Sequence, residues 1–307
     1  MPTLKRYLAL GALAVLGLGA AGEIAARSAG FGKPLLYQSS AAGYEPRPNQ
    51  HVARLGKITN INSSGTRGPE LAAQPAGLRV LSLGDSVANG GTQVNDDETY
   101  PALFGTLLAR TKPKAEVVNA SAGGWSVLNE AAWLKLHGTL GARLVVLEVN
   151  DRDLDQSFVG PEILDQHPSF PSHRPLSGLG EILFRYALPR TGLVPSAADP
   201  GSTGGDFQEN HARVTLDAIG EIKNFAQNHG ARLALLYWDA RLPVSAPQQK
   251  ARNELLAWAS AQGVTVIRPQ LNTSPTADKY FRDQIHPSVE GNRIVAKMLE
   301  DSLSKEM

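Results

Sequence analysis

The chain has 307 residues, of which 42% are apolar, and its formal net charge is +1. This length suits one large domain or two small ones, and the nearly balanced charge, with no dense basic stripe, argues against a nucleic-acid partner. Because the chain contains no cysteine, disulfides, thiolate catalysis, thiolate metal sites and lipid attachment through cysteine are excluded.

The N-terminal residues have the pattern of an export signal or a signal anchor. Lys5 and Arg6 precede an uncharged run over residues 7–22 that is rich in Leu, Ala and Gly. The run lacks the polar face of a core helix and has no clear Ala-x-Ala cleavage site. We therefore expect residues 1–30 to be an uncleaved anchor in the cytoplasmic membrane, with the rest of the chain facing the periplasm or exterior. The alternative is a cleaved signal peptide and a soluble exported protein.

Residues 31–77 are predicted to form an irregular N-terminal extension. This stretch is rich in Gly, Pro, Asn and Ser, which are typical of turns and loops. Two short strands are expected within it, over residues 51–54 and 57–61. We expect the extension to pack against the main domain.

The main domain is predicted over residues 78–307, where apolar strands alternate with helices. The expected strands cover residues 78–83, 116–119, 143–149, 233–238 and 264–267. The expected helices cover residues 99–109, 126–137, 248–262 and 288–304, with one more before the fourth strand, stopped by Gly230. This alternation predicts an α/β fold with a five-stranded parallel sheet covered by helices on both faces.

An insert at about residues 155–206 interrupts this alternation. It is rich in Pro, Ser and Gly, and one short helix is expected over residues 179–186. A long segment beside a strand end is often a lid or a substrate-binding element. A loosely packed surface loop would have the same composition, and both interpretations remain open.

Polar motifs follow each of the first three predicted strands of the main domain. Ser86 follows the first, Gly123 the second and Asn150 the third. Parallel α/β sheets bind ligands at the carboxyl ends of their strands, so these residues are expected at one edge. Asp283 and His286 lie three positions apart before the last helix. In a turn, this spacing lets the carboxylate bind one imidazole nitrogen and leaves the other free to face Ser86.

Together these residues are the parts needed to cleave an ester. A serine such as Ser86 is a poor nucleophile until a base removes its proton, and His286, oriented by Asp283, is the candidate base. The Ser86 N–H, a backbone N–H at Gly123 and the Asn150 amide are candidate donors to an oxyanion. Each motif is weak alone, since such residues also occur in ordinary turns. The prediction depends on their combination.

Rival catalytic motifs are missing from the sequence. It contains no Gly-x-Ser-x-Gly elbow, no Walker loop, no His-Glu-x-x-His and no dinucleotide-binding glycine pattern. The acidic run Asp96-Asp97-Glu98 precedes a predicted helix, where negative charge interacts favourably with the helix dipole. We therefore expect neither a metal site nor a cofactor.

The motifs taken together resemble those of the SGNH hydrolases, also called the GDSL esterase/lipase family. The residues that carry the resemblance are Gly84-Asp85-Ser86, the block 119–123 that ends in Gly123, Asn150-Asp151 and Asp283-x-x-His286. It extends from about residue 78 to the C-terminus. The resemblance implies a flavodoxin-like, three-layer α/β/α sandwich and metal-free esterase chemistry. It also implies a triad of Ser86, His286 and Asp283, with Gly123, Asn150 and the Ser86 N–H as oxyanion donors.

Two further features bear on this resemblance. Val149 stands where the family usually has glycine before the asparagine. Residues 61–70 look like a segment found ahead of the catalytic domain in some anchored bacterial members. We expect this segment to brace the fold rather than to bind substrate.

The sequence therefore predicts an exported serine ester hydrolase that acts on a small-molecule, lipid or polysaccharide ester, such as a carbohydrate O-acetyl group. Two alternatives remain. The same triad would serve an O-acyltransferase acting on envelope or exported polysaccharide, and a catalytically degenerate domain would bind a glycan or a protein partner. The acyl group, its acceptor and the oligomeric state are left open.

Overall fold

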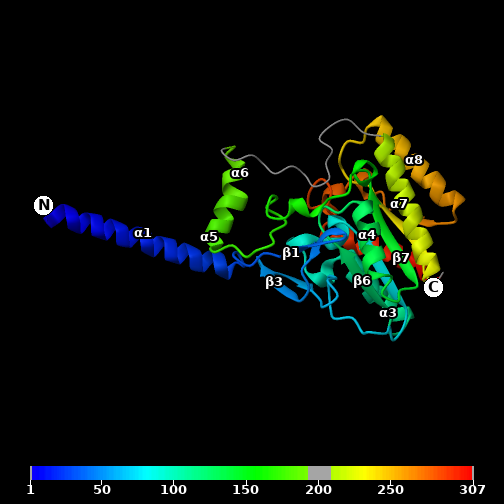
Figure 1. The fold of residues 1–307 in the computed structure, drawn as a ribbon, viewed down its shortest axis with the longest axis horizontal. Helices are drawn as coiled ribbons and strands as arrows, with labels where there is room; N and C mark the ends of the chain where they lie inside the picture. Colours follow the sequence, from blue (N-terminus) through cyan, green and yellow to red (C-terminus); the bar gives the residue numbers. More distant parts are fainter. Residues whose placement is uncertain (1, 193–208, 306–307) are drawn as a thin grey trace.

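A computed structural model describes residues 2–192 and 209–305 of the chain. At its centre is a five-stranded parallel sheet with the strand order β6-β5-β7-β8-β9. These strands are β5 (Arg79–Gly84), β6 (Glu116–Ser121), β7 (Leu144–Asn150), β8 (Arg232–Trp238) and β9 (Thr265–Ile267). Helices lie on both faces of the sheet (Figure 1). The predicted α/β/α sandwich with a five-stranded parallel sheet is confirmed.

Each face of the sheet packs on its own set of helices. One cluster of buried residues joins the sheet to α4 (Val127–His137), α7 (Glu209–Asn228) and α8 (Ala246–Ala261). The other joins it to α2 (Ser86–Asn89), α3 (Tyr100–Thr111) and α9 (Val289–Leu303). The predicted strands and helices of the main domain are therefore present, with ends shifted by a few residues.

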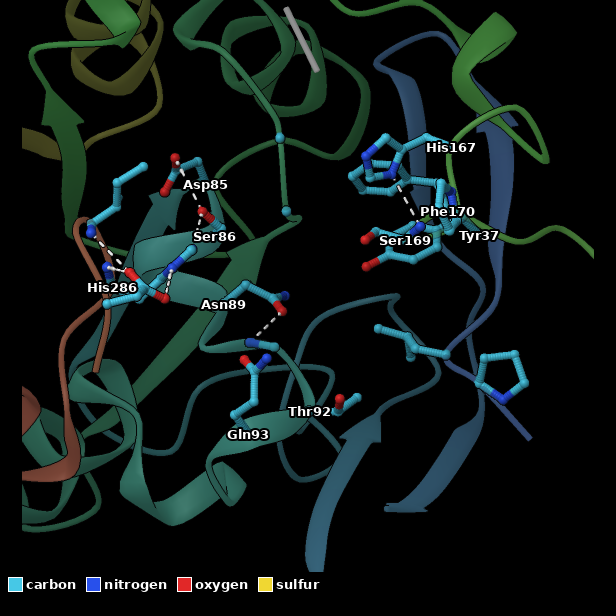
Figure 2. Close-up of a pocket in the computed structure, with 18 of the residues that line it drawn as sticks. Tyr37, Asp85, Ser86, Asn89, Thr92, Gln93, His167, Ser169, Phe170 and His286 are labelled. Atoms are coloured by element: carbon cyan, nitrogen blue, oxygen red, sulfur yellow. Dashed lines mark hydrogen bonds and ion pairs between the residues drawn. The ribbon is translucent and has the colours of Figure 1, made fainter. Parts of the chain in front are cut away.

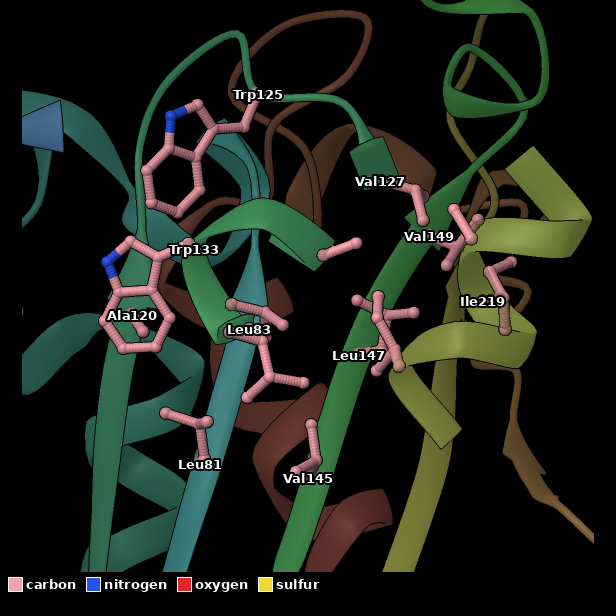
Figure 3. Packing of buried hydrophobic residues seen from close by; sticks show 14 of the residues in the cluster. Leu81, Leu83, Ala120, Trp125, Val127, Trp133, Val145, Leu147, Val149 and Ile219 are labelled. Atoms are coloured by element: carbon pink, nitrogen blue, oxygen red, sulfur yellow. The ribbon is translucent and has the colours of Figure 1, made fainter. Parts of the chain in front are cut away.

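The alternation of side chains along the strands explains why both faces are apolar. Leu81 and Leu83 of β5 belong to the first cluster, whereas Val80 belongs to the second. Figure 3 shows the first cluster, in which Val145 and Leu147 of β7 lie beside these leucines. Successive residues of a strand point to opposite faces, so a strand that is buried on both faces must be apolar throughout.

Helix α1 (Pro2–Ser28) projects away from the sandwich (Figure 1). Within Lys5–Ser28, an 18-residue window has a mean hydropathy of 1.9, and none of that window is buried. Its length and composition are sufficient to cross a membrane. The helix is compatible with a signal anchor or with a signal peptide.

The extension that follows α1 contains two antiparallel hairpins. They are formed by β1 (Tyr37–Ser40) with β2 (Gly43–Pro46) and by β3 (Gln50–Arg54) with β4 (Lys57–Ile61). The second hairpin was predicted and the first was missed, because Gly43 and Pro46 are typical of turns. Tyr37 and Tyr44 of the first hairpin are buried in the main core. As expected, the extension packs against the main domain.

Residues 61–70 connect the extension to the loop after the candidate nucleophile. The side chain of Arg67 is 1% exposed and forms an ion pair with Asp96 at 2.8 Å. Its guanidinium also donates to the backbone carbonyls of Asn89, Gly91 and Val94. The expected bracing role is consistent with these contacts.

The acidic run forms a short 3₁₀ turn, Asp96–Glu98, before α3. The sequence predicts only that these carboxylates interact with the helix dipole, but in the structure two of them also form ion pairs. Asp96 binds Arg67, and Glu98 binds Lys57 at 2.8 Å, so both acids pair with cations of the extension. Such long-range pairs have no local sequence signal.

The described part of the insert includes a continuous helical stretch. It consists of α5 (Gly178–Glu181), the π-helical η5 (Ile182–Ala187) and α6 (Leu188–Arg190), longer than the helix expected over residues 179–186. Residues 193–206 of the expected insert lie outside the described residues. The remaining short 3₁₀ turns are η1 (Gly91–Gln93), η3 (Asp153–Asp155), η4 (Pro161–Ile163), η6 (Leu271–Thr273) and η7 (Ala277–Lys279).

Candidate active site

The turn between β5 and α2 places Ser86 at the carboxyl edge of the sheet. Asp85 caps α2, and its carboxylate accepts the N–H of Val87 at 2.7 Å. Gly84 leaves no room for a side chain, since a Cβ there would lie 2.9 Å from the Cβ of Ala88 and 3.1 Å from that of Glu148. The turn therefore depends on glycine for close packing, and Ser86 becomes the first residue of a short helix.

The structure brings Ser86, His286 and Asp283 into one chain of hydrogen bonds. The Ser86 Oγ lies 2.9 Å from the Nε2 of His286, and the Nδ1 of His286 lies 2.8 Å from the Oδ2 of Asp283. Figure 2 shows His286 beside Ser86. With a proton on Nδ1, the ring accepts the Ser86 hydroxyl proton at Nε2, which is the arrangement of a serine nucleophile and its base.

Asp283 is held as a carboxylate. Its partial burial raises its pKa, but hydrogen bonds from the His286 ring and from the backbone N–H groups of His286 and Ile285 outweigh this effect. The net result is a pKa well below the usual range of an aspartate. An ionised Asp283 orients the His286 ring and stabilises the imidazolium that would form during attack.

The other two predicted site residues, Gly123 and Asn150, line the same cavity as Ser86. A Cβ built on Gly123 would lie 3.9 Å from the Ser86 Cβ, so the Gly123 backbone passes beside Ser86. The Gly123 carbonyl accepts the Tyr44 hydroxyl at 2.7 Å, which fixes this loop to the extension. All five predicted site residues therefore meet at one edge of the sheet.

Asn150 is the last residue of β7 and is 1% exposed. Its side-chain oxygen accepts the backbone N–H of Arg152 at 3.0 Å, which makes Nδ2 the donor end of the amide, and Nδ2 donates one of its two hydrogens to Glu148 Oε1 at 3.4 Å. Val149, which replaces the usual glycine, pairs with Tyr237 of β8 and is fully buried in the core. The valine thus extends the regular strand up to Asn150, and the chain bends after it.

The cavity in front of Ser86 has a volume of about 430 Å³. Its opposite wall comes from the extension and the insert, which contribute Tyr37, Phe170 and Tyr186. Figure 2 shows Tyr37, His167 and Phe170 grouped across from Ser86 and His286. The insert is therefore part of the cavity wall, as a substrate-binding element would be.

Three carboxyl groups lie buried beneath the site. Glu130, Glu148 and Asp153 are at most 1% exposed, and each has at least one oxygen without a hydrogen-bond partner among the described residues. Burial raises the pKa of all three well above the usual range, and the charge of Asp85 adds to this for Glu148 and Asp153. Burial therefore favours the neutral form of these groups, because an unpaired buried carboxylate is costly.

Acidification from about pH 8 to pH 5 is expected to stabilise the fold. The unfolded-state pKa values are near 4.5 and 3.8 and the folded-state values are higher, so folding takes up protons in this window. As pH rises, the free energy of unfolding should therefore fall. The expected slope is about 1.4 kcal/mol per pH unit for each proton that folding takes up. Urea unfolding of the full chain in detergent, followed by tryptophan fluorescence at several pH values, measures the slope.

Glu148→Gln should reduce this slope by about one proton, because glutamine does not titrate. Glu221→Gln is the matched control, since the Glu221 side chain is 57% exposed and its loss should leave the slope unchanged. A wild-type stability that is constant or rises between pH 5 and pH 8 would contradict neutral buried carboxyls.

Sequence reasoning missed several residues that hold the site in shape. Arg282 donates to the Gly90 carbonyl at 2.8 Å, Asn89 donates to the Ser121 carbonyl at 2.9 Å, and Asn119 donates to the Ala88 carbonyl at 2.9 Å. Asn119 had been recognised only as part of a motif. Each side chain binds a backbone carbonyl of a distant segment, which leaves no pattern in the sequence.

Comparison with known proteins finds one matching family. The model of the GDSL-like lipase/acylhydrolase family matches residues 82–294. Similar solved structures include a putative lipolytic protein of the G-D-S-L family from Desulfitobacterium hafniense DCB-2. It is 13% identical to this chain, the match covers 73% of this chain and 99% of that chain, and the TM-score is 0.47. The lipase/acylhydrolase from Enterococcus faecalis is 12% identical, the match covers 75% of this chain and 96% of that chain, and the TM-score is 0.48. No protein of curated function matches significantly.

The matched stretch covers more than half of the chain and includes the nucleophile turn, both candidate oxyanion loops and the turn that carries Asp283 and His286. The parallel sheet and its helical layers are those of an SGNH hydrolase. The chain belongs to the GDSL-like lipase/acylhydrolase family.

Proposed function

We propose that the protein is a serine ester hydrolase in which Ser86 is the nucleophile. The observation that carries this proposal is the short relay from Ser86 Oγ to His286 Nε2, at 2.9 Å, and from His286 Nδ1 to Asp283, at 2.8 Å. His286 takes the hydroxyl proton as Ser86 Oγ attacks the acyl carbonyl carbon. The resulting imidazolium is stabilised by the Asp283 carboxylate.

The negative charge that develops on the carbonyl oxygen is held by three donors. They are the backbone N–H groups of Ser86 and Gly123 and the side-chain amide of Asn150, which all line the cavity. Neutral donors that are already in place stabilise the tetrahedral intermediate without reorganising. Its collapse breaks the ester bond, and His286 returns the proton to the leaving alcohol.

The second half of the reaction releases the acyl group to water. His286 takes a proton from a water molecule as its oxygen attacks the acyl-Ser86 ester. A second tetrahedral intermediate is stabilised by the same donors, and the proton is then returned to Ser86 Oγ. The products are a free acid, an alcohol and the unmodified enzyme.

The size and lining of the cavity favour an ester with a small acyl group or a sugar-sized alcohol. About 430 Å³ is at the small end of ligand pockets. Aromatic rings of Tyr37 and Phe170 face polar side chains of Asn89 and Gln93 across it. This mixture suits an acylated carbohydrate or the polar end of a lipid ester.

We further propose that α1 is retained as a membrane anchor, with the catalytic domain on the outer side of the cytoplasmic membrane. Its last turns are bound to the folded domain rather than hanging free. Glu23 accepts the N–H groups of Gly178 and Leu179, each at 2.9 Å, and Arg27 donates to the Leu176 carbonyl at 2.9 Å. These contacts fix the end of α1 to the folded domain, so the helix leaves the domain at a defined place.

Covalent labelling tests the proposed nucleophile directly. A fluorophosphonate is expected to add one adduct, located at Ser86 by peptide mass spectrometry, because the relay activates this hydroxyl alone. Incubation with aryl esters of increasing acyl length should then show turnover that labelling abolishes. A well-folded protein that forms no adduct would contradict the proposal, and fast acyl transfer to added sugars with slow hydrolysis would reassign it to an acyltransferase.

A further inference from the structure

The insert exposes an apolar surface next to the point where α1 enters the domain. A groove of about 530 Å³ runs along it, lined by Pro34, Pro168, Pro171, Pro175, Leu176 and Phe184 among others. Leu176 is 99% exposed, Phe184 70% and Leu183 46%. Large apolar side chains clustered at this exposure mark a surface that contacts another apolar phase or partner. We call residues 174–190 and this groove the insert surface.

The insert surface is attached to the end of α1. Gly178 packs on Ala26 so closely that a Cβ at Gly178 would lie 3.1 Å from the Ala26 Cβ. A Cβ at Gly22 would likewise lie 3.1 Å from Leu179. Glu23 caps the start of α5 through the N–H groups of Gly178 and Leu179. The helical insert therefore begins at a defined place on the last turns of α1.

A second set of contacts, made by Glu181, holds the insert surface to the extension. The Arg54 and Glu181 side chains are both buried and form an ion pair at 2.8 Å. Glu181 also accepts the N–H of Gly32 at 2.6 Å, and the Arg54 guanidinium lies 4.3 Å from the centre of the Phe31 ring. Breaking a buried pair of this kind is costly. The pair therefore helps to hold α5, which contains Glu181, in one orientation relative to α1.

In that orientation, the helical stretch formed by α5, η5 and α6 runs across the direction of α1. Figure 1 shows α5 and α6 rising from the end of α1 at the edge of the domain. If α1 crosses a bilayer along its normal, a helix placed in this way lies near the plane of the membrane surface. Amphipathic helices that bind membranes adopt this position, with apolar side chains about 5–10 Å into the boundary between head groups and acyl chains.

The charges around the insert surface suit anionic lipid head groups. Lys33, Arg174 and Arg190 are exposed beside it. Among the described residues, the acidic groups Glu23, Glu181 and Asp165 beside it are each engaged by donors of the protein. Basic side chains next to exposed apolar residues are the pattern of a segment that binds a lipid surface.

We propose that the insert surface docks on the outer leaflet of the membrane that α1 spans, with Leu176, Leu183 and Phe184 inserted among the lipids. This inference rests on the membrane anchor of the proposed function and is independent of the ester chemistry. Pro34, Pro168 and Arg185 line both the groove and the catalytic cavity. The docked enzyme therefore presents its cavity to esters held at the membrane surface.

Because the chain has no cysteine, single introduced cysteines can report the depth of each position. The full chain carries a nitroxide at Leu176→Cys or Phe184→Cys and is reconstituted in vesicles of phosphatidylethanolamine and phosphatidylglycerol. Collisions with oxygen and with a water-soluble nickel chelate give the depth. Leu136→Cys on α4, 50% exposed in the sandwich, is the matched control. Leu13→Cys, 65% exposed on α1, reports whether that helix crosses the bilayer.

We expect nickel collisions at positions 176 and 184 to be about fivefold or more rarer than at position 136, because lipid excludes the chelate. Leu176 and Phe184 are so exposed that cysteine at either position leaves the core intact. If both positions resemble position 136 while position 13 is in lipid, the domain stands off the membrane and the docking proposal is overturned. If position 13 is also in water, the anchor and the docking proposal fail together. Loss of ester hydrolysis alters neither readout.

Discussion

Replacing Ser86 with alanine is expected to lower kcat for hydrolysis of p-nitrophenyl acetate by about 10,000-fold or more, because the acyl-enzyme can no longer form. The fold should be unchanged, since Ser86 Oγ makes its close contact with His286 and has little structural duty. Steady-state release of p-nitrophenol from the purified chain measures the effect. Residual turnover would come from the oxyanion donors and binding alone.

The control for this substitution is Ser260→Ala, which removes an exposed hydroxyl from α8. Its kcat should stay within about twofold of the wild type, because surface substitutions in a helix change the fold little. If Ser86→Ala retained most of the activity, another group would be the nucleophile. If both variants lost activity equally, the loss would not be specific to Ser86.

The sheet and the residues along its edge could be predicted because their signals are local. Strands buried on both faces appear as apolar runs, and Ser86, Gly123 and Asn150 each follow such a run. The strands β6, β5 and β7 are neighbours in the sheet, so topology alone brings their ends together. The short spacing of Asp283 and His286 similarly predicted their contact. The catalytic roles of these residues remain predictions.

The wall opposite Ser86 could not be predicted, because it is built by contacts between distant segments. Tyr37 lies on β1, which was not expected as a strand, and packs on Phe170 of the insert with ring centres 5.2 Å apart. Composition identified both segments only as irregular. The buried pair Arg54–Glu181, which joins extension to insert, likewise gives no local pattern. Long-range contacts of this kind set the size of the cavity and hence the choice of substrate.

The extension and the insert form the wall of the cavity opposite Ser86. The sandwich carries the proposed nucleophile, its proposed base and the proposed oxyanion donors. The extension adds Tyr37 and the Tyr44 hydroxyl that holds the Gly123 loop, and the insert adds Phe170 and Tyr186. We therefore expect acyl and alcohol preference to respond to changes in these two segments, with the triad left in place.

Arg67→Ala is expected to lower the free energy of unfolding by about 3–5 kcal/mol, because it removes a buried guanidinium that pairs with the partly buried Asp96 and donates to three backbone carbonyls. Asp96 would lose its ion pair with the guanidinium, and the carbonyls of Asn89, Gly91 and Val94 would lose the hydrogen bonds from Arg67. A buried acceptor without a donor costs about 1–3 kcal/mol. Urea unfolding of the full chain in detergent, followed by tryptophan fluorescence, measures the change.

Two further variants test whether the loss of stability comes from the specific contacts of Arg67 or from the loss of any arginine. Arg67→Lys keeps the charge but lacks the planar fork that reaches several carbonyls at once, so it should recover only part of the lost stability. Arg110→Ala, on the exposed face of α3, should change the free energy of unfolding by less than about 0.5 kcal/mol. Because Asn89 ends the helix that begins with Ser86 and Gly91 lies two residues further on, Arg67→Ala should also lower kcat under folding conditions. If Arg67→Ala were no less stable than Arg110→Ala, residues 61–70 would not brace the nucleophile loop.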